Sequence, residues 1–516
     1  MSCRFCGREN LNFIFMRKSI VVVSFIIALV VLIVTNCSNP PIVVGSTDVV
    51  PQPFPDSSVT GIQFPTDSTV INGWINDAAF PTRYDSTNIY KHAWGIWAGL
   101  TAPTQQEVGG DSLLVFETWM GLNEVQAYIL GDSISCQPGG LRKRGRAPLT
   151  RPRQFEHAGI LARTINLAAR KRLQVGNSVQ GDTAVAANNL WVTVSYDPNM
   201  ACYTINNKLF RQSVINRYYK PNGYGQVNPF PNSSLFIKPT YLEYPANAIL
   251  LQMPVWLNPP NPPDSLNVFD STGTQFPFVV YVDVKNRQTK NKTLVPVTPT
   301  CKSIDSIAGA TCNLNDFINF TVDSTMAAFM NQQDSVQGLF GPSRAEPGNR
   351  VLLVAMHVGT KEISNWTWQT FYWTPLPSTP GGPSSNLAAS LMPSTVQGAA
   401  RHYAANAAYV MTTPNNSREF NAGSMFGYNP YLEGGFGPTT FNYPNLYRPA
   451  FKYGMQCNCM SCHSLAVPSP NGVYVTDEPI NVPEPIFCKN QVRMDFVWSV
   501  QTALINDTIP YWNFAK

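Results

Sequence analysis

The stretch Val351–Trp373, VLLVAMHVGTKEISNWTWQTFYW, carries the clearest fold signal in this chain of 516 residues. Its first six residues, Val351–Met356, form a continuous apolar run, which predicts a buried strand. His357 follows directly, and Trp366–Trp373 is rich in aromatic residues. The sequence therefore predicts a buried strand that leads into a histidine and an aromatic cluster.

Other strands are predicted on both sides of this stretch. β-Branched and aromatic residues dominate Asn189–Tyr196, Ser234–Tyr241 and Pro277–Val284, and Asp111–Trp119 also has strand character. Apolar residues at helical spacing in Phe155–Lys171 predict an amphipathic helix. We therefore expect an α+β fold with a β-rich, loop-heavy body.

The composition agrees with this fold class. Charged residues make up 13% of the chain, about half the usual quarter. The 43 prolines and 12% aromatic residues favour short elements joined by well-packed loops over a helical bundle. The formal net charge of +5 is too small to imply a nucleic-acid partner.

The N-terminal region predicts an export signal. A basic start at Met16-Arg17-Lys18 precedes the apolar run Ile20–Val34, whose length suits a signal peptide better than a membrane span. We assign residues 1–36 to a signal peptide, with translation starting at Met1 or Met16. An uncleaved anchor helix is the alternative.

Val34-Thr35-Asn36-Cys37 resembles a bacterial lipoprotein box, although Asn36 replaces the small residue expected before the cysteine. Cys37 would then carry the lipid, and residues 37–60 would form a flexible tether to the membrane. Both this reading and an anchor helix export the rest of the chain. We expect a periplasmic or outer-membrane lipoprotein in a bacterial cell envelope.

The segment Pro375–Ser385 contains many prolines, glycines and serines, and the sequence predicts that it is an internal boundary or a mobile loop. It divides an α+β body, residues 61–375, from a C-terminal region, residues 376–516. That region contains Cys459-Met-Ser-Cys462-His463, the C-x-x-C-H pattern at which haem c is attached. Two thioether bonds to the cysteines and His463 as proximal iron ligand are the chemistry that this pattern predicts.

Two other uses of these cysteines remain open. Cys457, Cys459, Cys462 and Cys488 could offer four thiolates to zinc or an iron–sulfur cluster, although the Cys457-x-Cys459 spacing fits zinc sites poorly. Two of them could instead form a structural disulfide.

Cys3, Cys6, Cys37 and the two cysteines of the C-x-x-C-H motif are set aside here. Six cysteines remain: Cys136, Cys202, Cys301, Cys312, Cys457 and Cys488. An even number in an oxidising compartment permits three disulfides. Cys301–Cys312 is the most plausible local pair. The other pairings stay open.

The order of several motifs resembles large bacterial cytochrome c family proteins of unassigned function, which have a single C-terminal C-x-x-C-H motif. Besides the opening stretch, the matching pieces are HAWGIWAGLT (92–101), VFETW (115–119), NNLWVTVSYD (188–197), SLFIKPTY (234–241), YNPYLEGGFG (428–437), CMSCHSLA (459–466) and MDFVWSVQTA (494–503). The resemblance implies that body and haem region act as one unit, but it supplies no substrate. Cys457 departs from the family pattern.

The sixth iron ligand is not decided by the sequence. Met494 is the sole methionine after His463, but Met494–Trp498 also has the character of a helix start. The short C-terminal tail is expected to pack its haem against the body, which makes His357 the best of the histidines outside the motif. An open iron site is the third possibility.

The occupancy of the sixth iron position bears on which of three functions is expected. A closed, six-coordinate haem suits electron transfer with an unidentified redox partner protein, and this is the function that we expect. An open iron would suit a peroxidase-like, haem-dependent oxidoreductase or a ligand sensor. A surface lipoprotein with haem as a structural staple is the third. The motifs G-x-S-x-G, G-x-G-x-x-G and H-E-x-x-H are absent from the sequence, as is a P-loop.

Overall fold

The computed structural model describes fourteen stretches of the chain. They are residues 49–75, 84–108, 111–131, 136–138, 156–157, 184–186, 189–256, 278–284, 295–296, 311–336, 344–410, 427–433, 458–469 and 489–513. All of them belong to one unit that spans residues 44–516. The unit is mixed α+β and β-rich, as the sequence predicts, and most of its strand pairs are antiparallel.

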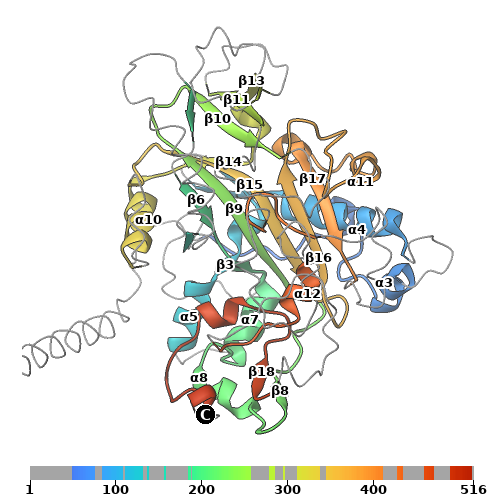
Figure 1. Cartoon of the computed structure of the whole chain (residues 1–516), viewed down its shortest axis with the longest axis vertical. Helices are drawn as coiled ribbons and strands as arrows, with labels where there is room; N and C mark the ends of the chain where they lie inside the picture. Colours follow the sequence, from blue (N-terminus) through green and yellow to red (C-terminus); the bar gives the residue numbers. More distant parts are fainter. Residues whose placement is uncertain are drawn as a thin grey trace, which may run out of the picture. The chain divides into compact units, whose positions relative to one another are not determined.

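A nine-stranded sheet forms the centre of the unit (Figure 1). Its main path is β17 (Tyr403–Ala408), β16 (Thr367–Trp373), β15 (Arg350–Thr360), β9 (Leu235–Tyr244), β6 (Asn189–Val192) and β4 (Glu156–His157). The strands β14 (Asn319–Thr321), β7 (Ser195–Tyr196) and β3 (Met120–Gly121) join it at the side. The buried strand predicted over 351–356 is confirmed, because these residues lie in the first half of β15.

Three smaller sheets accompany it among the described residues. The first contains β12 (Val295–Pro296), β11 (Phe278–Asp283), β10 (Leu250–Val255), β5 (Ala184–Ala186) and β13 (Thr311–Asn313). The others pair β1 (Pro103–Val108) with β2 (Asp111–Leu114), and β8 (Tyr224–Gln226) with β18 (Gln491–Arg493).

The described α-helices are mostly short. They are α2 (Ser57–Thr60), α3 (Ser68–Ile75), α4 (Ser86–Leu100), α5 (Leu122–Leu130), α7 (Pro198–Asn206), α8 (Gln212–Ile215), α10 (Ser324–Val336), α11 (Asn386–Ser390), α12 (Cys459–His463) and α14 (Ser499–Thr502). None of them has both the length and the apolar character needed to span a membrane.

The central strands are buried on both faces. Every residue of β16 is buried, and so is every residue of β15 after Arg350. Because neighbouring side chains of a strand point to opposite faces, the register divides these residues into two sets. Thr360 lies opposite Thr367 on one face, while His357 lies opposite Thr370, and Gly359 opposite Trp368, on the other.

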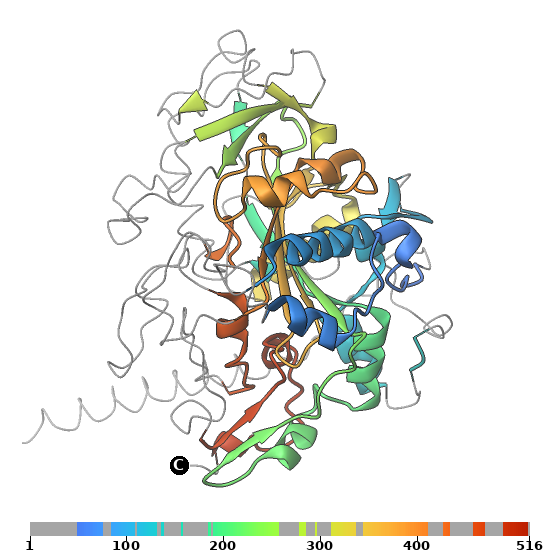
Figure 2. The ribbon, with the colours of Figure 1, turned by 90° about the vertical axis from the view of Figure 1, so that its right-hand side faces the viewer.

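Helix α4 covers the first of these faces (Figure 2). Asp85 caps its N-terminus by accepting a hydrogen bond from the Asn88 amide. Two buried indoles attach the helix to α11 and to the 3-10 helix Gly398–His402, because Trp94 donates to the Ala388 carbonyl and Trp97 to the Ala400 carbonyl. The Trp97 ring also stacks on Phe371 of β16 at a centroid distance of 4.4 Å.

A buried polar network joins α4 to the sheet. His92 bonds through Nε2 to the Glu362 carboxylate at 3.1 Å and through Nδ1 to the Tyr409 hydroxyl. The Thr360 hydroxyl and the Thr66 amide also donate to Glu362. Although burial opposes the charged form, His92 and these donors lower the pKa of Glu362 below its ordinary 4.5.

Glu362→Gln is therefore expected to lower the free energy of unfolding by about 3 kcal/mol at pH 7, because it removes a buried carboxylate to which His92, Thr360 and Thr66 are hydrogen-bonded. A carboxyl whose pKa is depressed by folding stabilises the protein above its unfolded pKa, and this contribution is lost as the pH falls. The difference between the variant and the natural chain should thus shrink below about pH 4.5. Urea unfolding at several pH values measures it. Glu346→Gln, at an exposed position, is the matched control, and equal effects of the two changes would contradict the prediction.

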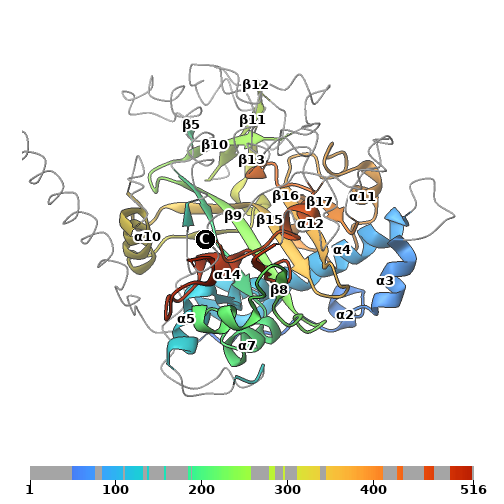
Figure 3. The same ribbon diagram turned by 60° about the horizontal axis from the view of Figure 1, so that its bottom comes forward.

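The C-terminal residues contact elements from the middle of the sequence. Strand β18 pairs in parallel with β8, and the Ile505 carbonyl accepts a hydrogen bond from the Gln212 amide. The Ser499 hydroxyl bonds to Tyr196 of β7 at 2.6 Å. Figure 3 shows this C-terminal segment beside α5 and α7.

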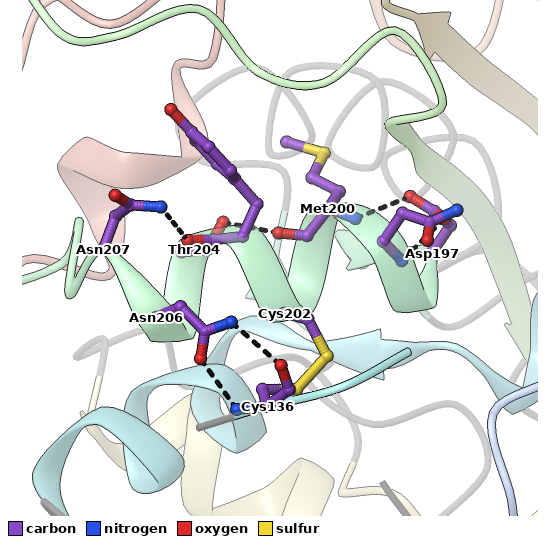
Figure 4. The surroundings of a disulfide bond; sticks show 9 residues. Cys136, Asp197, Met200, Cys202, Thr204, Asn206 and Asn207 are labelled. Carbon is purple, nitrogen blue, oxygen red and sulfur yellow. Dashed lines mark hydrogen bonds between the residues drawn. A yellow bond between two sulfur atoms is a disulfide. The ribbon is translucent and has the colours of Figure 1, made fainter. Parts of the chain in front are cut away.

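A disulfide joins Cys136 to Cys202 on α7 (Figure 4). Asn206, one turn further along the helix, bonds to both the amide and the carbonyl of Cys136, at 2.7 and 2.9 Å. The sequence left this pairing open. The predicted pair Cys301–Cys312 cannot be followed, because Cys301 lies outside the described residues.

Several sequence predictions need correction. Residues 49–60, assigned to the tether, instead lie against the body: the Gln52 amide donates to the Thr118 hydroxyl, and its carbonyl accepts from the Trp119 indole. The helix expected over 155–171 begins with strand β4, because Glu156 and His157 pair with β6; its remainder lies outside the described residues. The predicted strand over 111–119 ends at Leu114 and continues as a 3-10 helix.

The boundary predicted at 375/376 falls within the central sheet. Strand β17, from the supposed C-terminal region, pairs with β16 along its whole length. Residues on both sides of the boundary therefore share one core, and the loop over 375–385 is a connection between neighbouring strands. Signal peptide, lipid site Cys37 and residues 37–48 lie outside the described residues.

Candidate functional site

The C-x-x-C-H motif forms the short helix α12, which lies beside β16 (Figures 1 and 3). Cys459 and Cys462 are three residues apart, so the helix brings them to the same side. Asn458 starts the turn, because its carbonyl accepts from the Cys462 amide and its side chain donates to the Val410 carbonyl after β17. The motif is thus attached directly to an edge of the sheet.

His463 is held by the backbone of a distant segment. Its Nδ1 lies 2.8 Å from the Phe496 carbonyl oxygen, a contact that requires a proton on Nδ1. Nε2 then keeps the free lone pair, which is the arrangement that a metal-ligating imidazole needs. The Trp368 ring lies 4.2 Å from the His463 ring, between centroids, and the Phe236 ring 6.1 Å away.

The surroundings of His463 favour its neutral form. The side chain is only half-buried by accessible surface, but protein atoms surround it densely. This desolvation, together with the nearby Lys238 and His357, lowers the pKa of His463 to about 3. The imidazole is therefore uncharged at neutral pH, as an iron ligand must be.

Three contacts fix α12 to residues 493–498, here called the 493–498 segment. Arg493 donates to the Ser464 carbonyl, the Trp498 indole donates to the Cys462 carbonyl, and Phe496 accepts from His463. The helix start predicted at Met494 does not form, because Asp495 and Phe496 have positive φ angles of 46° and 70°. These left-handed residues turn the Phe496 carbonyl toward the histidine.

Cys459 lies in a closely packed position. Its thiol donates to the Gly427 carbonyl at 2.8 Å, and burial raises the pKa of the thiol well above its usual range. A Cβ on Gly427 would lie 2.8 Å from the Ala408 Cβ and 3.3 Å from the Cys459 sulfur, so only glycine fits here. Such a site disfavours a thiolate and favours an uncharged sulfur, such as that of a thiol or a thioether. Cys459 is not disulfide-bonded, which excludes a disulfide within the motif.

His357 lies next to the motif with both ring nitrogens engaged. Nδ1 is 2.8 Å from the Thr370 hydroxyl and 4.0 Å from the Cys459 sulfur, and Nε2 is 2.6 Å from the Glu433 carboxylate. Although burial opposes ionisation, His357 and Lys238 lower the pKa of Glu433 to about 2. His357 would have to give up one of these partners to bind iron.

The structure brings some predicted residues together and separates others. Cys459, Cys462, His463, His357 and Met494 all lie around α12. Met494 belongs to the 493–498 segment; its amide bonds to the Ala466 carbonyl, and its side chain is buried. His92 lies on the opposite face of the sheet, and His402 pairs with Asp316. Cys37, Cys457 and Cys488 lie outside the described residues.

Sequence reasoning missed several residues of this site. Thr370 and Trp368 share the face of His357 and Gly359, which strand alternation and register would reveal once the pairing of β15 with β16 is known. Glu433 lies in the quoted motif YNPYLEGGFG, but nothing in the sequence links it to His357. The Phe496 carbonyl has no sequence signal, because a backbone atom is contributed by any residue.

Gly359 makes room for the aromatic rings around His463. A Cβ at this position would lie 2.6 Å from the Phe236 ring, which packs against Trp366, Trp368 and His463. Gly359→Ala must displace this ring, and we expect it to lower the free energy of unfolding by about 1–3 kcal/mol. Urea unfolding measures the change.

Gly73→Ala is the matched control. Gly73 lies within α3, and its added Cβ would meet no atom within 4 Å. The same substitution should here raise the stability by about 0.5–1 kcal/mol, because alanine favours the helix. A lower stability of Gly359→Ala together with a higher stability of Gly73→Ala would support the packing role of Gly359. A stabilising effect of Gly359→Ala would refute it.

Among the described residues, no three His, Cys, Asp or Glu side chains are grouped so that they could hold a metal ion by themselves. A haem needs less from the protein: two sulfurs and one or two axial ligands. The donor set of α12, with an uncharged sulfur site and a lone pair on His463 Nε2, fits haem c. The chain matches no protein-family model, no curated protein and no solved structure.

Proposed function

We propose that this chain is an exported monohaem c-type cytochrome. Haem would be attached through Cys459 and Cys462, with His463 as the proximal iron ligand. The observation that carries the proposal is the hydrogen bond from His463 Nδ1 to the Phe496 carbonyl, within a C-x-x-C-H helix. This bond leaves Nε2 as the ligand atom and increases the basicity of the imidazole.

The position of the motif also supports the proposal. The helix lies against a sheet face that carries Phe236, Gly359 and Trp368 from three adjacent strands. Such a setting agrees with a C-terminal haem-binding region packed against the body. A haem supplies an iron centre that exchanges one electron. Rigid hydrogen bonds at the axial histidine suit electron transfer, since little has to rearrange when the charge of the iron changes.

Export and lipid anchoring form part of the proposal. A disulfide such as Cys136–Cys202 is typical of oxidising compartments, which supports a periplasmic or outer-membrane location in a bacterial envelope. The partners would be a redox protein and, through Cys37 or an anchor helix, a membrane. Cell fractionation tests this: recovery of the natural chain in the cytoplasm would contradict it.

One observation favours a second function. His357, the best candidate for the sixth ligand, is already bonded through its two ring nitrogens to Thr370 and Glu433. His357 is therefore not available to the iron in this arrangement. An iron site open to small molecules would support a haem-dependent oxidoreductase or a ligand sensor.

Carbon monoxide distinguishes the two functions, because it binds reduced iron only where a coordination position is open. For an electron carrier, the optical spectrum of the reduced protein should be unchanged by carbon monoxide. Rapid binding would refute the closed electron carrier and favour the oxidoreductase or sensor.

A further inference from the structure

The turn that holds His463 is fixed by a buried ion pair. Lys361, just after β15, places its ammonium group 2.7 Å from the Asp495 carboxylate, and each side chain is at most 5% exposed. The ammonium group also donates to the Ser364 carbonyl and lies 5.5 Å from the centre of the Trp366 ring. The second carboxylate oxygen of Asp495 accepts from the Phe230 amide. The loop between β15 and β16 is thus bonded directly to the 493–498 segment.

Asp495 and Phe496, next to this ion pair, have an energetically unfavourable backbone conformation. A left-handed conformation costs a non-glycine residue about 1–3 kcal/mol, and here Asp495 and Phe496 both adopt it. A buried ion pair adds little net stability, because both charges lose their hydration. Burial accordingly lowers the pKa of Lys361 and raises that of Asp495. Asp495 therefore combines a strained backbone with a desolvated charge, and it directly precedes Phe496, whose carbonyl accepts the hydrogen bond from His463.

We propose that Lys361 and Asp495 are positioning residues for the axial ligand. Through the strained turn, they fix the Phe496 carbonyl on His463 Nδ1 and so set the tautomer and basicity of the imidazole. This inference rests on the proposed function in one respect: with haem attached at α12, the pair sets the reduction potential. The orientation of His463 itself depends on the pair with or without haem.

A double variant tests the proposal. Lys361→Met alone would remove the cation but leave a buried carboxylate unpaired, which can unfold the chain. The double variant Lys361→Met/Asp495→Asn removes both charges and keeps an oxygen for the Phe230 amide, so it is expected to fold. The matched control is Arg211→Met/Asp507→Asn. That pair, at 3.5 Å, also joins the C-terminal residues to the body, but it is 20% exposed and lies outside the site.

The first readout needs no haem. In the full chain with Cys459→Ala and Cys462→Ala, the ¹⁵N shifts of labelled His463 report which ring nitrogen carries the proton. We expect a single Nδ1–H tautomer, which the Lys361/Asp495 variant converts to a mixture and the Arg211/Asp507 variant leaves unchanged. An unchanged His463 tautomer in the Lys361/Asp495 variant would overturn the proposal, even if its stability falls.

The second readout is the midpoint potential of the haem-loaded chain. Loss of the Phe496 hydrogen bond makes the imidazole less basic and stabilises ferrous iron, so the potential should rise. A tenfold change in the reduction equilibrium is expected, which corresponds to about 59 mV for one electron. An unchanged potential would overturn this part. Absence of haem in the natural chain would refute the proposed function, while the ¹⁵N readout would still decide the role of Lys361.

Discussion

Cys459→Ala combined with Cys462→Ala is expected to abolish covalent haem completely. The two sulfurs are the only attachment points that the motif offers, and α12 brings both to one side of the helix. After export in cells that can mature c-type cytochromes, the natural chain should keep haem through denaturing electrophoresis. The double variant should show no haem stain at equal protein amounts.

The matched control is Cys457→Ser combined with Cys488→Ser. These cysteines would be ligands if the four thiols formed a zinc or iron–sulfur centre, but a c-type haem does not need them. We expect the control to keep its haem stain. A natural chain without haem stain that holds a stoichiometric metal, together with loss of this metal from the control, would contradict the haem assignment and favour the cluster.

His463→Ala is expected to have the second largest effect. It removes the nitrogen that would hold the iron and the hydrogen bond to the Phe496 carbonyl. Any haem attached to the variant should have an optical spectrum that differs from that of the natural protein, because one axial ligand is missing. Added imidazole should restore the spectrum of the natural protein in part, since it can enter the space left by the side chain.

His402→Ala is the control for this experiment. His402 pairs with Asp316 and is not part of the site around α12. Its replacement should leave the spectrum unchanged. A natural spectrum in His463→Ala would mean that another residue is the proximal ligand.

The sequence predicted the central strands because apolar and aromatic residues form continuous runs there. Val351–Met356 was recognised as a buried strand for this reason. The continuous apolar run does not show which residues share a face of the sheet. Because every position is buried, no alternation of apolar and polar residues distinguishes the side chains that face α4 from those that face α12. Only the register of β15 against β16 separates Thr360 from His357.

The candidate site was predictable where its residues are close in sequence. Cys459, Cys462 and His463 form a local pattern with a chemical meaning. The partners of these residues are distant in sequence and include backbone atoms, such as the carbonyls of Gly427 and Phe496. The pair Lys361–Asp495 is separated by 134 residues, and no spacing rule connects such charges.

The wrong predictions share one physical cause. Residues 49–60 are rich in proline and serine, a composition typical of linkers, yet their backbone groups find partners in Gln106 and Thr118. Tertiary hydrogen bonds thus override the local preference. The same applies to Glu156 and His157, which pair with β6 as a strand although their segment has helical periodicity.

The most direct test of the account is the pyridine haemochrome spectrum of the full-length chain, purified after export and extracted with acidic acetone. The account predicts one haem per chain that resists extraction, with the spectrum of a haem whose two vinyl groups are saturated by thioether bonds. A chain without haem absorbance, or with a haem that is removed by the solvent, would contradict it.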